Sequence, residues 1–127
     1  MRRRNLLIAS ILITFVALRG FLHSRPDADL NVASYNIHHL FTGVLVLTIF
    51  GVPAVLWRNK RELPDRVVAG FGVGLGLTLD EWFYLIVTDG SNLAYTLPIS
   101  FWSATALISL ACVYVLLVAR RVSRPAE

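Results

Sequence analysis

Four long apolar segments limit what this chain of 127 residues can fold into. They cover residues 5–22, 37–57, 67–87 and 101–119. Each is close to the roughly 20 residues that a helix needs to cross a hydrocarbon core about 30 Å thick. Together they occupy more than half of the chain. We therefore predict an all-α fold, a four-helix membrane bundle that forms a single integral membrane domain over residues 1–127.

The charge content agrees with a membrane protein. Only 16% of the residues are charged, against roughly a quarter in an average soluble domain. The formal net charge of +4 could suggest a nucleic-acid partner, but the basic residues flank the apolar segments, where membrane topology accounts for them. We predict the lipid bilayer as the partner and no nucleic acid.

The basic residues also predict the orientation. Ten of the twelve lie on one side of a four-pass topology: Arg2, Arg3, Arg4, Arg58, Lys60, Arg61, Arg66, Arg120, Arg121 and Arg124. Arg19 and Arg25 belong to the other side. Short basic loops stay cytoplasmic, so both termini are predicted inside a cell membrane, with residues 23–36 and 88–100 outside. No small-residue cleavage site follows the first apolar run, which favours an uncleaved helix over a signal peptide.

Ionisable residues interrupt the apolar segments. Asp80 and Glu81 lie in the third segment, and His38 and His39 open the second. Charged groups at membrane depth are costly and are usually kept for function or for pairing. At 1.5 Å per residue, the two acids lie about 10 Å below the outer end of their helix, and the histidines lie a few ångströms below the outer end of theirs, so all four fall in the outer half. We predict one polar pocket, open to the outside, between the second and third helices.

Other polar residues lie near this depth. Thr42 is one turn below His38, and Tyr84 is one turn above Asp80. Arg19 or His23, near the outer end of the first helix, could reach the same pocket. An arginine so close to a helix end more often extends to the headgroups.

Glycines alternate along the third segment and predict its place in the bundle. Gly70 and Gly74 form one GxxxG pair, and Gly72 and Gly76 form another about 200° around the helix. Small residues let helices approach closely in lipid, so we expect the third helix to be central and packed on two sides. Continuing these faces directs Glu81 and Asp80 toward packed neighbours. The same motifs are also compatible with a homo-oligomer.

Three kinds of chemistry remain open for the pocket. His38, His39, Asp80 and Glu81 are suitable ligand types for Zn or Fe, although adjacent helical residues diverge by about 100° and no HExxH motif supports them. A haem between His23 and one of the paired histidines is geometrically conceivable. A carboxylate near a histidine could also relay protons, as in a membrane enzyme or a proton-coupled carrier.

The remaining alternative is a structural role. An acid pairs with Arg19, the histidines hydrogen-bond at the interface, and the cluster fixes helix packing in a structural or assembly subunit. Cys112, the single cysteine, lies in an apolar helix and excludes an internal disulfide.

Two stretches carry a resemblance. Residues 35–43, YNIHHLFTG, and residues 72–82, GVGLGLTLDEW, resemble a group of small prokaryotic integral membrane proteins. These join a helix that opens with His-His to a glycine-alternating helix that ends in Asp-Glu. The resemblance implies an architecture and a candidate site at His38, His39, Gly43, Asp80 and Glu81. It implies no particular reaction.

Overall fold

A computed structural model describes residues 2–25, 31–32, 35–57 and 63–122 of the chain. Its long helices are α1 (Arg2–Ser24), α2 (His39–Leu56), α3 (Asp65–Val87) and α5 (Pro98–Val122). A short helix, α4 (Asn92–Tyr95), lies between α3 and α5. The four long helices are each long and apolar enough to cross a membrane, which confirms the all-α prediction and indicates a multi-pass membrane protein.

The helices differ from the predicted segments at their ends. α1 begins at Arg2, and α5 extends from Pro98 to Val122, because helical hydrogen bonding continues past the apolar stretch. We expected the second helix near residue 37, but α2 begins at His39. Tyr35–Asn36 forms a strand, β2, that pairs antiparallel with β1 at Asn31–Val32. This two-residue ladder was not predicted.

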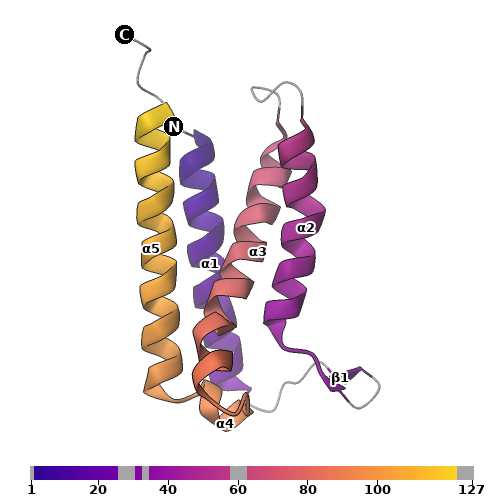
Figure 1. Ribbon diagram of the computed structural model, residues 1–127, viewed down its shortest axis with the longest axis vertical. Helices are drawn as coiled ribbons and strands as arrows, with labels where there is room; N and C mark the ends of the chain where they lie inside the picture. Colours follow the sequence, from indigo (N-terminus) through magenta and orange to yellow (C-terminus); the bar gives the residue numbers. More distant parts are fainter. Residues whose placement is uncertain (1, 26–30, 33–34, 58–62, 123–127) are drawn as a thin grey trace.

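Helix α3 lies at the centre of the bundle. It packs against α2 on one side and against α1 and α5 on the other (Figure 1). The start of α1 and the end of α5 lie at one end of the bundle, and α4 and the short ladder lie at the opposite end (Figure 1). We call that opposite end the α4 end.

One glycine face of α3 packs on α2. A Cβ atom at Gly74 would lie only 2.8 Å from the backbone nitrogen of Leu47 and 3.1 Å from the carbonyl oxygen of Gly43. A Cβ atom at Gly70 would overlap the ring of Phe50. On α2, a Cβ atom at Gly43 would in turn lie 2.7 Å from the backbone nitrogen of α3 residue Thr78. The two helices therefore touch along their backbones.

The other glycine face of α3 packs on α1. A Cβ atom at Gly72 would lie 2.7 Å from the Cβ atom of Ser10, and one at Gly76 would lie 2.9 Å from the Cβ atom of Thr14. The predicted central position of this helix, packed on two sides, is confirmed. Small residues serve here for close approach, because lipid provides no hydrophobic drive for helices to associate.

The interior of the α4 end is polar. Among the described residues, the buried polar side chains are Thr78, Asp80, Glu81 and Ser100, and Asp80 is only 1% exposed. Many large apolar side chains are instead exposed, including Leu45, at 60%, and Ile86, at 68%. This distribution suits a bundle surrounded by lipid, where apolar surface needs no burial and charge does.

A turn after α3 directs the chain back across the α4 end of the bundle. Gly90 has a φ of 74°, a conformation that glycine adopts at no steric cost. The Asp89 carboxylate accepts a hydrogen bond from the Ser91 backbone N–H at 3.0 Å, which lowers the pKa of Asp89. Ser91 then caps α4 by accepting from Ala94 N–H at 3.2 Å. This turn places Tyr95 inside the bundle, where it is 8% exposed.

Candidate functional site

A cluster of paired side chains occupies the interior of the α4 end. We call it the charge cluster, and its members come from four helices and the residue before α2: Arg19, His38, His39, Asp80, Glu81 and Tyr95. Adjacent positions on α3 diverge by about 100°, so Asp80 and Glu81 face different neighbours.

Asp80 is the centre of the charge cluster. Its Oδ1 accepts a hydrogen bond from Arg19 Nε on α1 at 2.6 Å. Its Oδ2 accepts from the Tyr95 hydroxyl of α4 and lies 2.9 Å from Nε2 of His39 on α2. Both oxygens of this buried carboxylate are therefore satisfied, and Asp80 joins three helices to α3.

Glu81 binds the start of α2. Its Oε2 accepts a hydrogen bond from the backbone N–H of Leu40 at 2.8 Å, and its Oε1 lies 3.1 Å from His38 Nδ1. The first backbone N–H groups of a helix have no partner within the helix. The side chain of His38, the residue that precedes α2, does not cap it. Glu81 supplies the missing acceptor from α3, with a negative charge that complements the helix dipole.

Arg19 extends inward from α1 and bridges to two further segments. Its Nη2 donates to the carbonyl and hydroxyl oxygens of Ser100, both at 3.1 Å, and Nη1 donates to the Tyr95 carbonyl at 3.3 Å. The guanidinium also stacks over the Tyr95 ring, with Cζ 4.1 Å from the ring centroid. The Arg19 side chain does not extend away from the protein, as is usual for such an arginine, because Asp80 binds it inside the bundle.

Aromatic rings enclose the charge cluster. Tyr95 makes edge-on contacts with Tyr84 and His39, with centroid distances of 5.5 and 5.7 Å. The Tyr84 hydroxyl donates to the Ser91 carbonyl at 2.8 Å, so Tyr84 contributes its ring to the cluster. Burial, and next the charge of Asp80, raise the pKa of Tyr95. Tyr95 therefore remains a protonated donor.

The structure brings together the four residues that were predicted to share one pocket. His38, His39, Asp80 and Glu81 all lie in the charge cluster, and Arg19 joins them. The remaining two candidates lie apart. His23 is exposed at the end of α1 and Thr42 is half-buried on α2, and within the described part of the chain neither hydrogen-bonds to the cluster.

Two members of the site were missed by sequence reasoning. Neither Tyr95 nor Ser100 was among the predicted site residues. Neither residue lies near the acids in sequence, and the turn at Asp89–Ser91 followed by α4 carries them inward. The Ser-capped start of α4 is the only local signal that could have indicated this second turn.

The saturated carboxylates bear directly on metal binding. All four carboxylate oxygens of Asp80 and Glu81 lie within hydrogen-bond distance of nitrogen or hydroxyl groups of the protein. Across the residues that the structure describes, no group of three or more His, Cys, Asp or Glu side chains is placed to hold a metal ion. In the same residues, no buried side-chain nitrogen or oxygen lacks a partner. Asp80 and Glu81 are therefore paired with groups of the protein itself.

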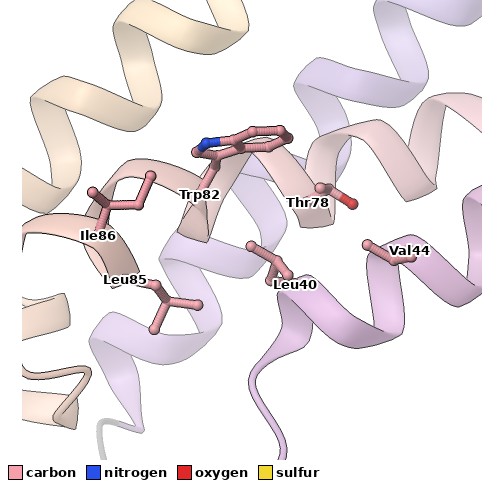
Figure 2. A pocket seen from close by; sticks show the side chains of 6 residues that line it. All are labelled: Leu40, Val44, Thr78, Trp82, Leu85 and Ile86. Carbon is pink, nitrogen blue, oxygen red and sulfur yellow. The ribbon is translucent and has the colours of Figure 1, made fainter.

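A groove on the lipid-facing side runs between α2 and α3 near the charge cluster. It has a volume of about 260 Å³ and is lined by Leu40, Val44, Thr78, Trp82, Leu85 and Ile86 (Figure 2). No charged residue lines it. Since it is open and apolar, the groove matches the hydrocarbon around it and adds no chemistry to the cluster.

The fold and the site define a small four-helix membrane protein with a buried, internally paired charge cluster at one end. Comparisons of the chain with known protein families, curated proteins and solved structures found no significant match. The functional argument therefore depends on the geometry of the site.

Proposed function

We propose that this is a structural or assembly protein of the prokaryotic cell membrane, in which the charge cluster fixes the arrangement of four spans. One observation carries the proposal: each oxygen of Asp80 and Glu81 faces a donor supplied by another segment of the protein. A site built for an external ligand would leave ligand-binding atoms accessible.

Membrane energetics explain why such pairing specifies an arrangement. A charge near the membrane core is tolerated when it is paired, and removal of one partner leaves the other uncompensated. A rotation or sliding of α3 would separate Asp80 from Arg19 and Glu81 from Leu40 at once. The glycine faces permit close approach, and the charge cluster selects one register among those that the smooth glycine surface allows.

The placement of basic residues supports an orientation with the α4 end outside. Arg2, Arg3 and Arg66 lie at the beginnings of α1 and α3, and Arg120 and Arg121 lie near the end of α5. These helix ends are opposite the α4 end (Figure 1). Basic segments are retained in the cytoplasm, so both termini belong inside and the charge cluster belongs to the outer half. The resemblance to small prokaryotic membrane proteins fits the same picture.

The topology has a direct test. Single cysteines at Ser24 and Ser91 in a chain with Cys112 replaced by alanine are expected to react with an impermeant thiol reagent added to intact cells. A cysteine introduced at Arg121 is expected to react only after lysis. Reaction of the Arg121 site in intact cells would reverse the proposed orientation.

The structural role is tested by measuring metal content and stability together. Purified protein is expected to contain no stoichiometric Zn or Fe, and Asp80→Asn and Glu81→Gln are expected to lower its melting temperature or change its oligomeric size. Stoichiometric metal that is lost in both variants would support the metal-binding alternative and contradict the proposal. Unchanged melting and sizing would also contradict it.

A second candidate, a proton-coupled carrier, has one specific observation in its favour. His39 lies between the two acids, with Nε2 2.9 Å from Asp80 and Nδ1 3.3 Å from Glu81. One proton could therefore be shared among three groups, an arrangement that proton relays use. This candidate predicts pH-dependent flux in liposomes, and a flat response across the range in which histidine titrates would reject it.

A further inference from the structure

A second cavity at the α4 end lies between α1, α4 and the start of α5, on the opposite side of the bundle from α2. Its volume is about 450 Å³, and it is lined by Arg19, Gly20, His23, Tyr95, Thr96 and Phe101. Two of these residues are basic and none is acidic. The cavity therefore differs from the apolar groove between α2 and α3, and the charge cluster shares with it only Arg19 and Tyr95.

Gly20 keeps this cavity open. A Cβ atom at Gly20 would meet no atom within 4 Å, whereas Gly72 and Gly76 on α3 press directly against α1. Gly20 therefore serves no helix contact within the described residues. Glycine destabilises a helix interior by roughly 0.5–1 kcal/mol relative to alanine. The space beside Gly20 is therefore free for a ligand of this cavity.

Arg19 retains binding capacity toward the cavity. A guanidinium has five N–H groups. Nε binds Asp80, both hydrogens of Nη2 have acceptors in Asp80 and Ser100, and one hydrogen of Nη1 is given to the Tyr95 carbonyl. The other Nη1 hydrogen has no acceptor among the described residues. His23, one helical turn further along α1, adds a second exposed donor at the mouth.

The surroundings of the cavity suit a ligand with an apolar part. Phe101 lines it and contacts Phe15 and Trp102, with ring centroids 6.2 and 5.4 Å apart. Trp102 is 66% exposed and Phe101 is 42% exposed, so this aromatic surface continues toward the surrounding lipid. Aromatic side chains of this kind are enriched at the headgroup level of a bilayer.

We infer that this cavity binds the phosphate-bearing headgroup of an anionic phospholipid, with an acyl chain along the aromatic surface of α5. Arg19 and His23 supply the donors, and the guanidinium geometry suits a phosphate oxygen. Asp80 occupies the Nε side of Arg19, so the lipid meets the Nη1 side and does not displace the ion pair. A bound lipid would cover the opening of this cavity between α1 and the α4 segment.

The test uses the full chain in detergent, with thermal melting and native mass spectrometry as readouts. Phosphatidylglycerol is expected to bind and to raise the melting temperature, and phosphatidylcholine is expected to do neither. Gly20→Leu fills the cavity, and it should fold because its side chain enters open space. Gly20→Leu is expected to weaken phosphatidylglycerol binding by about tenfold or more, which corresponds to the loss of one charge-assisted hydrogen bond.

Two further variants keep the result interpretable. His23→Ala removes an exposed donor and is expected to weaken binding roughly two- to fivefold. Ala9→Leu places the same side chain at an exposed position of α1 that does not line the cavity, and it is expected to bind as wild type does. Equal binding of both lipids, or unchanged binding by Gly20→Leu, would overturn the inference. Stabilisation by inorganic phosphate equal to that by phosphatidylglycerol would reject the lipid as the source of the phosphate.

Discussion

Arg19 and Asp80 form an ion pair 2.6 Å long, in which the Asp80 side chain is fully buried and that of Arg19 is 13% exposed. The same two helices are joined at their other end by Arg2 and Asp65, 2.7 Å apart, with side chains that are 86% and 44% exposed. Because both pairs link α1 to α3, they allow a buried Arg–Asp ion pair to be compared with an exposed one.

The buried pair is expected to control stability. Asp80→Asn leaves the Arg19 charge without its carboxylate inside the bundle, and breaking a buried pair in this way typically costs about 3–5 kcal/mol. Asp65→Asn is the matched control, since exposed pairs contribute at most about 1 kcal/mol. Unfolding in mixed micelles measures both. Similar losses for the two variants would contradict the assigned role of Asp80.

Replacement of glycine by alanine is expected to change stability in opposite directions at Gly20 of α1 and Gly74 of α3. Gly74→Ala places a methyl group 2.8 Å from the backbone nitrogen of Leu47, so α2 must move away, at a cost of about 1–3 kcal/mol. Gly20→Ala meets open space and should gain about 0.5–1 kcal/mol from helix propensity. Melting temperatures of the two variants check both signs, and a gain from Gly74→Ala would be inconsistent with the close helix contact.

Glu81 is expected to protect the backbone amides in the first turn of α2 from hydrogen exchange. In Glu81→Leu the Leu40 N–H loses its acceptor, and a buried donor left unsatisfied costs about 1–3 kcal/mol. Amide hydrogen exchange should therefore accelerate at Leu40 and at its neighbours in the first turn. Amides near Leu47, in the middle of α2, provide the internal reference. Uniform acceleration along α2 would indicate global destabilisation and argue against a specific cap.

Tyr95 is expected to make stability depend on alkaline pH. Its pKa is raised on folding above the ordinary tyrosine value of 10.0, mainly by burial. Its contribution is therefore complete below about pH 10, where both states are neutral, and it is lost as pH rises and the unfolded state ionises. The melting temperature of the wild type should fall above pH 10 more steeply than that of Tyr95→Phe. Tyr114→Phe, at a position 68% exposed on α5, should behave as wild type does.

Local sequence pattern was enough for the spans and for the faces of the central helix. Apolar length predicts how many helices cross the membrane, because the bilayer thickness sets the required length. The 3.6-residue period places the glycines on two faces of α3 and directs Glu81 and Asp80 toward packed neighbours, which the structure shows to be α2 and α1. The rise per residue likewise predicted that the histidines and the acids lie in the same half of the bundle.

Only the tertiary structure decided which groups pair. Arg19 binds Asp80 across 61 positions of sequence, and Tyr95 and Ser100 reach the cluster because α4 turns back under the bundle. Such contacts depend on the translation and rotation of one helix against another. The local sequence around a residue does not determine these quantities. The sequence by itself determined that charge is buried at one end of the bundle. The packing decided that this charge is satisfied by the protein itself, because close backbone contact at the glycines brings every donor within reach.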